Sequence, residues 1–260
     1  MSQIDLSPPL LRPPVRDSMW SVADWVSIQL RREALLRHVP RGANVLEFRA
    51  GAGHFTEVLH QLGCGISVAD PSLAELRSTR AYAVARGFES SIQAWYHTDI
   101  LALDGVADAA HDAVVAYGGA LSHASQQRHE ALAECRRVLR PAGVLAIDVL
   151  SLWGTLHRHL SRIVGRDIAY SRSVIRSGDV VAGGRELHLF RAAELRAFLS
   201  QAGFKIISLF ASSVLSTGRE VPRWPDAGAW RELLEYERAA CVERGCLESG
   251  TRLVAVAHRY

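Results

Sequence analysis

A glycine-rich turn between two short apolar runs constrains the fold of this chain more than any other feature. The first run, residues 45–48, has the character of a buried strand and leads into Gly51 and Gly53. An amphipathic stretch follows, and a second apolar run ends in the carboxylate of Asp70. This order is typical of nucleotide-binding α/β units, where glycine lets the backbone approach the ligand and the acid accepts hydrogen bonds from ribose hydroxyls. The pattern therefore predicts an α/β fold with a nucleotide-like ligand.

Length and composition fit a globular protein of this class. The chain has 260 residues, of which 48% are hydrophobic and 22% are charged. Its formal net charge of +3 is too small to indicate nucleic-acid binding. No stretch approaches the roughly 20 apolar residues that span a bilayer, and the N-terminus lacks the apolar segment of a secretory signal. We therefore expect a cytoplasmic protein with no membrane or nucleic-acid partner.

The cysteines follow neither a metal-binding nor a disulfide pattern. No two of them are spaced as C-x-x-C, and no histidine lies beside them at zinc-ligand spacing. We expect no metal site and reduced, structural thiols at Cys64, Cys135, Cys241 and Cys246.

Strands and helices alternate from residue 44 to about residue 150. The expected strands are 44–48, 65–69, 92–97, 112–117 and 143–149. The expected helices are 20–39, 54–62, 72–86 and 125–139, with a short element near 104–109. Several of these strands are almost continuously apolar, which is typical of parallel strands covered on both faces.

The segment 151–190 interrupts this rhythm. A helical stretch near 153–164 leads into a strand-like run at 168–175, a glycine-rich turn and a further strand at 186–190, which together predict a hairpin or cap over the sheet. The α/β pattern then resumes. Its expected elements are a helix at 191–202, a strand at 204–211, a helix near 228–243 and a strand at 251–258.

This order of motifs resembles the class I S-adenosylmethionine (SAM)-dependent methyltransferases, well over residues 20–150 and more loosely over 186–258. The acid and glycine turn of that family's first strand match Glu47 and residues 51–53, and the acids after its second and third strands match Asp70 and Asp99. The turn at 139–143 resembles the family's Leu-x-Pro-Gly-Gly. Two residues depart from the pattern by replacing glycines, and these are Arg49 and Ala142.

The resemblance implies a Rossmann-like, seven-stranded, mostly parallel sheet with helices on both faces, an antiparallel last strand and a small cap insertion. It also divides the chain into four parts. These are an N-terminal arm and helix (1–40), a SAM-binding core (41–150), the cap insertion (151–190) and the C-terminal part of the core sheet (191–260).

The resemblance further implies a set of SAM-binding residues at the carboxyl ends of the strands. Carboxylates would face the ammonium, the ribose diol and the adenine amine of SAM, with Asp70 at the ribose and Asp99 at the adenine. The full expected set is Glu47, Arg49, Ala50, Gly51, Gly53, Asp70, Pro71, Asp99, Ile100, Tyr117 and Gly118.

Methyl transfer from a sulfonium is an in-line displacement that needs alignment and a dry pocket more than acid–base groups. The two candidate catalytic residues, Tyr117 and His123, lie at the exit of the fourth expected strand. His123 would deprotonate an oxygen or nitrogen nucleophile, because histidine titrates near neutral pH, or would only cap the next helix or line the pocket. Tyr117 is interpreted mainly as a wall of the methionine pocket.

The sequence is thus identified as that of a SAM-dependent methyltransferase that acts on a small-molecule acceptor by O-, N- or C-methylation, as a monomer or homodimer. No Asn-Pro-Pro-Tyr-like motif follows the fourth strand, which argues against methylation of nucleobase amines.

Two alternatives stay open. One is a SAM-binding relative that transfers no methyl group (a cyclase, a regulator or an inactive partner), since Arg49 occupies a glycine position. We expect Arg49 to turn away from the sulfur and pair with the SAM carboxylate or a neighbouring acid. The other is an NAD-dependent oxidoreductase, which is less favoured because no third small residue follows Gly53 at the spacing its fingerprint requires.

Overall fold

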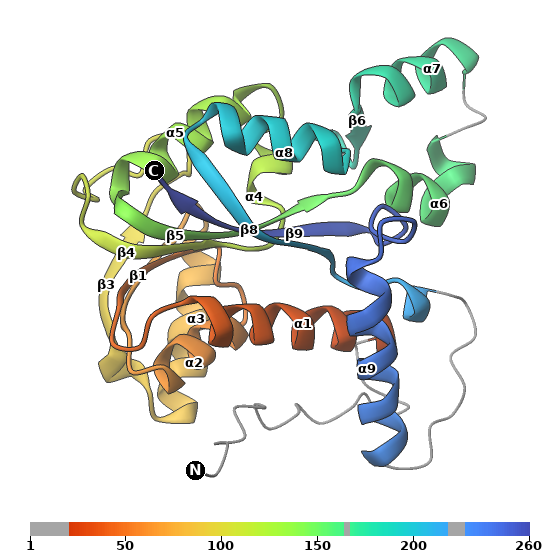
Figure 1. Cartoon of the computed structure of the whole chain (residues 1–260). Coiled ribbons are helices and arrows are strands. Elements are labelled where there is room, and N and C mark those ends of the chain that lie inside the picture. The colour runs from red at the N-terminus through yellow and green to blue at the C-terminus, as the bar shows by residue number, and fades with distance from the viewer. Residues whose placement is uncertain (1–20, 164–166, 218–226) are drawn as a thin grey trace.

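Seven strands form one twisted sheet in the order β3-β2-β1-β4-β5-β9-β8 in the computed structural model, which describes residues 21–163, 167–217 and 227–260 (Figure 1). Neighbouring strands are parallel except that β9, the last strand in the chain, runs antiparallel to both β5 and β8. The strands are β1 (Asn44–Phe48), β2 (Gly65–Asp70), β3 (Ile92–His97), β4 (His111–Ala116), β5 (Leu139–Leu150), β8 (Phe204–Ala211) and β9 (Arg252–Arg259). The expected Rossmann-like sheet with an antiparallel last strand is confirmed.

Helices cover both faces of this sheet and enclose two apolar cores. One face carries α1 (Val22–His38), α2 (His54–Gln61), α3 (Leu73–Arg86) and α9 (Ala227–Val242) (Figure 1). The other face carries α4 (Ala120–His123), α5 (Arg128–Val138) and α8 (Ala192–Gln201).

The inner strands alternate between these two cores. Val45 packs into the core under α1 and α2, whereas its neighbour Leu46 packs into the core under α5, and neither side chain is exposed. Because both faces are covered, both sets of side chains must be apolar. This is why β1 was recognisable from sequence as a mainly apolar run, which only Glu47 interrupts.

Helix α1 begins at a capping box and ends shortly before a proline. The side chain of Ser21 accepts the backbone N–H of Asp24, and the Asp24 carboxylate accepts the backbone N–H of Ser21, which completes a capping box. Pro40 follows the helix closely. The first 20 residues, which include most of the expected N-terminal arm, lie outside the described residues.

The strand expected at 168–175 is wrong. This segment is part of a helix, α7 (Ile168–Ser177), whose first turn is capped by the carboxylate of Asp167. The buried residues are Ser171 and Val174, which are three positions apart, so the pattern that suggested alternation is a helical face. Gly178 ends the helix with a φ of 82°, a conformation that glycine adopts without steric cost.

A hairpin does form in the 151–190 segment, with its second strand close to the one expected at 186–190 and its first strand after the expected one at 168–175. Its strands are β6 (Asp179–Ala182) and β7 (Arg185–His188), which pair antiparallel across the turn at Gly183 and Gly184. Helix α6 (Leu152–Ile163) leads from the main sheet toward this part of the chain, and α6, α7 and the hairpin stand beside α8 in Figure 1.

Two further predicted elements differ from those in the structure. The helix expected at 125–139 is divided into α4, the 3-10 turn η2 (Ser125–Gln127) and α5, with Ser125 at a φ of 48°. The short element expected near 104–109 consists of turns. His123 therefore ends α4 and does not cap the longer helix.

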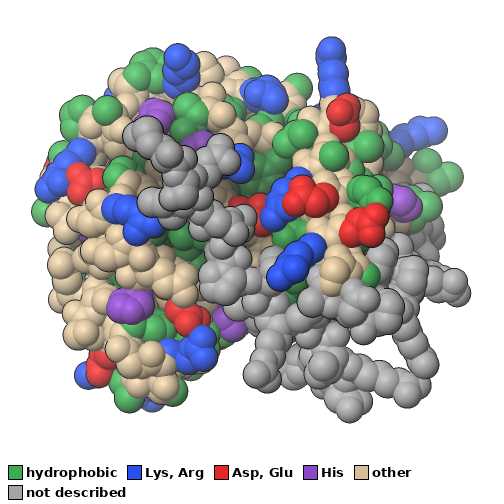
Figure 2. Space-filling view, turned by 60° about the horizontal axis from the view of Figure 1, so that its bottom comes forward, with side chains coloured by type: hydrophobic (Ala, Val, Ile, Leu, Met, Phe, Trp, Pro, Cys, Tyr) green, Lys and Arg blue, Asp and Glu red, His purple; other side chains and the backbone are tan. Residues whose placement is uncertain are grey.

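Surface charge is mixed in sign. Basic and acidic side chains are interspersed on the face shown in Figure 2, in keeping with the small net charge. Within the three described ranges, none of the helices has both the length and the apolar character required to cross a bilayer.

Candidate functional site

The carboxyl ends of β1 to β4 meet at one edge of the sheet and bring the predicted site residues together. Phe48 pairs with Ala69, and Asp70 pairs with His97, so the chain segments that leave β1, β2 and β3 start side by side. β1 also pairs with β4, which delivers Tyr117 to the same edge. Open α/β sheets bind ligands at this edge, outside the carboxyl ends of their strands.

The glycine turn after β1 is a tightly fixed cradle. Gly51 and Gly53 have φ values of 56° and 81°, and a Cβ atom at Gly53 would lie 2.9 Å from the ring of Tyr82. The hydroxyl of Thr79 donates to the carbonyl of Gly51 at 2.6 Å, which ties the turn to α3. Both glycines are therefore required by the backbone and by its close neighbours.

Arg49 shares the left-handed conformation of this turn, with a φ of 57°. Its backbone N–H donates to the carbonyl of Ala69 at 2.8 Å, which holds the turn against β2. Of the two partners expected for Arg49, the neighbouring acid is not engaged, because the guanidinium forms no ion pair within the described residues. Pairing with the SAM carboxylate stays a prediction. Position 49 thus combines a backbone conformation typical of glycine with a cationic side chain that has no ion-pair partner within the described residues.

Glu47 is the strongest sign of a ligand at this edge. Its side chain is buried, and its Oε2 atom has no hydrogen-bond partner among the described residues. Burial raises the pKa of Glu47 to about 7, although the nearby Thr56 hydroxyl opposes the shift. A buried carboxylate oxygen without a donor is costly, so this atom has the chemistry to receive a cation or a polar hydrogen from a ligand.

Asp70 and Asp99 supply two more carboxylates. Asp70 is 3% exposed, and its Oδ1 atom accepts the backbone N–H of Ser72 at 2.8 Å. Burial raises the pKa of Asp70, while that hydrogen bond and the positive charge of Arg49 partly offset the effect. Asp99 is more exposed and accepts the backbone N–H of Leu101 at 3.0 Å.

A pocket of about 460 Å³ opens next to these carboxylates. Four of the predicted site residues line it, namely Arg49, Pro71, Asp99 and His123. The hairpin contributes Arg185 and Glu186 to the same lining, which explains how the inserted segment can influence a ligand here.

Tyr117 is buried and packed against an aromatic and a cationic side chain. It is 3% exposed, its ring packs edge-on against Phe55 at 4.9 Å, and the guanidinium of Arg31 lies 5.5 Å from the ring centre. Burial raises the pKa of Tyr117 far above neutrality. The phenol hydroxyl has no partner among the described residues.

His123 lies in α4 on the pocket wall. Burial lowers its pKa, and the charges of nearby arginines lower it further, namely Arg49, Arg252 and Arg185. The neutral imidazole is therefore favoured at pH 7, which is the form that can accept a proton.

The structure also shows functional candidates that the sequence analysis missed. Asp148, in β5, is fully buried and accepts the N–H of Gly119 at 2.6 Å. Its other oxygen pairs with Arg31 of α1 at 2.8 Å and with Arg252 of β9 at 3.3 Å. An acid inside an apolar strand is the signal that could have revealed this group, since a buried charge needs partners.

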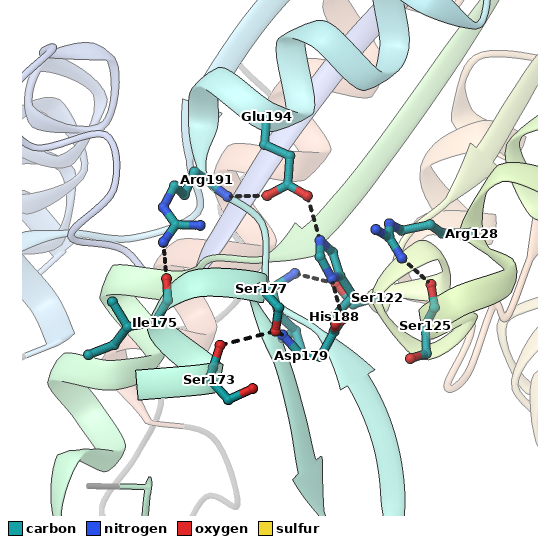
Figure 3. A network of polar contacts seen from close by, with 11 residues as sticks. Ser122, Ser125, Arg128, Ser173, Ile175, Ser177, Asp179, His188, Arg191 and Glu194 are labelled. Atoms are coloured by element: carbon teal, nitrogen blue, oxygen red, sulfur yellow. Dashed lines mark hydrogen bonds and ion pairs between the residues drawn. The ribbon is translucent and has the colours of Figure 1, made fainter. Parts of the chain in front are cut away.

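His188 has a structural role. Its ring is buried between the Asp179 and Glu194 carboxylates, with N···O distances of 2.7 and 2.6 Å (Figure 3). Both ring nitrogens are used, so this histidine ties the hairpin to α8 and is not available to a substrate.

Comparison with known proteins agrees with this geometry. The model of a family described as "Methyltransferase domain" matches residues 46–147, the stretch from β1 to β5. No curated protein sequence matches the chain.

Solved structures share the fold over most of the chain. The Burkholderia thailandensis 1,6-didemethyltoxoflavin-N1-methyltransferase, with bound 1,6-didemethyltoxoflavin and S-adenosylhomocysteine, is 18% identical with a TM-score of 0.55, covering 90% of this chain and 78% of that one. A Mesorhizobium loti S-adenosylmethionine-dependent methyltransferase is 17% identical with a TM-score of 0.58, covering 91% and 98%. The [4+2]-cyclase SpnF is 19% identical with a TM-score of 0.60, covering 94% and 84%.

Proposed function

We propose that this chain, whose residues 46–147 match the model of a methyltransferase-domain family, binds SAM and transfers the methyl group to a small-molecule acceptor. The observation that carries the proposal is the unpartnered, buried carboxylate oxygen of Glu47 directly before the glycine turn. A cation or hydrogen-bond donor at that place would remove the cost of its burial.

The residues at the sheet edge fit the polar groups of SAM one by one. Glu47 would accept the α-ammonium, and the glycine turn would lie against the methionine part. Asp70, which already accepts one backbone N–H through Oδ1, would accept the ribose hydroxyls. Asp99 and Pro71, on the wall of the 460 Å³ pocket, would flank the adenine, with Ala50, Ile100 and Gly118 completing the expected set.

SAM, when bound, supplies an electrophilic methyl group on a sulfonium. The chain's own contribution would be alignment and exclusion of water, for which the packed Tyr117 and Phe55 rings form an apolar wall. His123, held neutral near pH 7, would accept the proton of an oxygen or nitrogen nucleophile. A carbon nucleophile would need no such base if it is already an anion.

Calorimetric titration of the protein with SAM, S-adenosylhomocysteine and NADH tests the ligand. We expect micromolar binding of the first two and none of NADH, and weaker binding by the Glu47→Ala variant than by an Asp104→Ala control. Asp104 is exposed and lies outside the pocket lining, so its loss changes charge alone. A heat of binding on titration with NADH, and none on titration with SAM, would favour the oxidoreductase alternative.

A second candidate function is SAM-dependent but transfers no methyl group. Arg49 favours it, because this residue lines the pocket and its guanidinium has no ion-pair partner within the described residues. Incubation with SAM and a panel of acceptors separates the two functions. S-adenosylhomocysteine forms only if the methyl group moves, so a product that forms without it would favour the second function.

A further inference from the structure

A second pocket, of about 270 Å³, lies between the first half of α1, helix α6, the end of β8 and the start of β9. Three arginines from three separate elements line it, namely Arg31, Arg158 and Arg252. Among its described lining residues the one acid is Asp24, whose carboxylate already accepts the N–H and hydroxyl of Ser21 in the α1 cap.

The positive charge in this pocket is not balanced within the described residues. Arg31 and Arg252 share a single oxygen of Asp148, at 2.8 and 3.3 Å, so two guanidinium groups are paired with one carboxylate. Burial lowers the pKa of Arg31, Asp148 opposes that shift, and the neighbouring charge of Arg252 lowers the pKa further. Arg158 is exposed and forms no ion pair with any residue that the structure describes. A bound anion would relieve this excess of charge.

A buried hydroxyl in the same pocket also lacks a partner. Ser212 follows β8 and is 1% exposed, and its Oγ atom has no hydrogen-bond partner among the described residues. Its backbone N–H donates to the carbonyl of Arg252 at 3.1 Å, so the two residues lie side by side in the lining of the pocket. Buried hydroxyl groups are nearly always hydrogen-bonded, and this one could donate to an oxyanion.

The pocket adjoins the place where methyl transfer is proposed. A Cβ atom at Gly119 would lie 3.2 Å from Nη1 of Arg252 and 3.7 Å from the ring of His123. Gly119, at a φ of 75°, thus lets the arginine and the histidine approach from two sides. A molecule anchored near Arg252 could therefore extend toward His123.

We propose that this pocket binds an anionic group of the acceptor, a carboxylate or a phosphate, through Arg158, Arg252 and the Ser212 hydroxyl. The inference rests on the proposed function, because it assigns the anion to the acceptor and not to SAM. Guanidinium groups present planar, paired donors that match both kinds of oxyanion. Arg31, whose side chain is 11% exposed, mainly positions Asp148 and through it Gly119.

The test is a titration of protein saturated with S-adenosylhomocysteine, using inorganic phosphate and, separately, benzoate at constant ionic strength. We expect saturable binding of at least one, and the tighter of the two identifies the type of anion. Arg158→Gln and Ser212→Ala should each weaken that binding at least tenfold. Arg158 is exposed, so its variant should fold normally even where Arg252→Gln, which removes one of the two arginines paired with the buried Asp148, does not. Arg77→Gln, the loss of an exposed arginine of α3, is the matched control and should bind like the native protein.

Three results would overturn the proposal. The first is that neither anion binds saturably to protein that does bind S-adenosylhomocysteine, which leaves the proposed function intact. The second is that Arg158→Gln weakens the binding of S-adenosylhomocysteine tenfold but leaves anion binding unchanged. That result would assign the pocket to the cofactor carboxylate. The third is a native protein that binds neither SAM nor S-adenosylhomocysteine, which removes the proposed function together with this assignment.

Discussion

The carboxylate of Asp148 accepts the backbone N–H of Gly119 at 2.6 Å and thereby fixes the loop that leaves β4 to the middle of the sheet. The same carboxylate pairs with Arg31 and Arg252, so one buried acid connects α1, β9 and the loop that leads into α4, the helix of His123. The position of the loop after β4 therefore depends on a residue that is itself fully buried in the sheet.

We expect Asp148→Asn to lower the free energy of unfolding by about 3–5 kcal/mol, because it leaves the buried Arg31 charge without a counter-charge. Urea denaturation followed by tryptophan fluorescence measures this. Asp104→Asn, an exposed acid in a turn, is the control and should change stability by less than about 0.5 kcal/mol. A loss below about 1 kcal/mol in Asp148→Asn would show that the two arginines do not depend on this carboxylate.

Glu47 should make the ligand-free protein less stable as pH rises. Its pKa is about 7 in the folded protein and about 4.3 in the unfolded chain, so between these values the folded state binds more protons. The stability that the protonated Glu47 contributes is therefore fully present below about pH 4, declines as pH rises above that value, and is lost once the pH has passed through 7. Glu47→Gln should remove this loss and make the variant more stable at pH 8 by up to about 3 kcal/mol. Equal pH dependence of denaturation in both proteins would contradict the burial of an unpartnered carboxylate.

The parts of the fold predicted from sequence are those fixed by local patterns. β1 and the glycine turn were recognisable because strands buried on both faces must be apolar and because tight turns need glycine. Helix α7 is hard to predict because its buried residues, Ser171 and Val174, form only a weakly apolar face, and the Asp167 cap is the one local sign of its start.

Within the candidate site, the sequence could predict only the positions of acids that lie at the end of a single strand. Glu47, Asp70 and Asp99 could be placed because parallel strands deliver their carboxyl ends to one edge. The cluster of Arg31, Asp148 and Arg252 joins residues more than 100 positions apart, and no local pattern in the sequence relates them.

His188→Gln should destabilise the packing of the hairpin on α8. Burial alone would raise the pKa values of Asp179 and Glu194, but hydrogen bonds from His188 hold both below their usual values. Losing two hydrogen bonds to carboxylates should lower the free energy of unfolding by about 2 kcal/mol. His157→Gln, an exposed histidine of α6, is the control. Native-like stability and unchanged hydrogen exchange in β7 would show that this contact is dispensable.

Asp70→Ala should weaken binding of S-adenosylhomocysteine by about 2–4 kcal/mol, because the ribose hydroxyls would lose a charged acceptor. Calorimetry on the folded variant measures the change. Asp70→Asn should lose less, since its one amide oxygen can still accept the Ser72 N–H while its NH2 group can donate to a ribose hydroxyl. Unchanged affinity in Asp70→Ala would show that the ribose binds elsewhere.

Arg49→Gly tests whether this residue accommodates or blocks SAM. The backbone at position 49 already has a φ of 57°, so glycine fits there without rearrangement. The substitution relieves backbone strain of about 1 kcal/mol in the folded state, and the greater conformational freedom of glycine in the unfolded chain offsets part of that gain in stability. We expect a folded variant whose SAM affinity differs from the native value by about tenfold or less, roughly 1.4 kcal/mol. Arg49→Asn is the matched variant, because asparagine tolerates this conformation but removes the charge. If both variants bind SAM tightly and the native protein does not, the guanidinium excludes the cofactor, and the chain is a methyltransferase relative that has lost SAM binding.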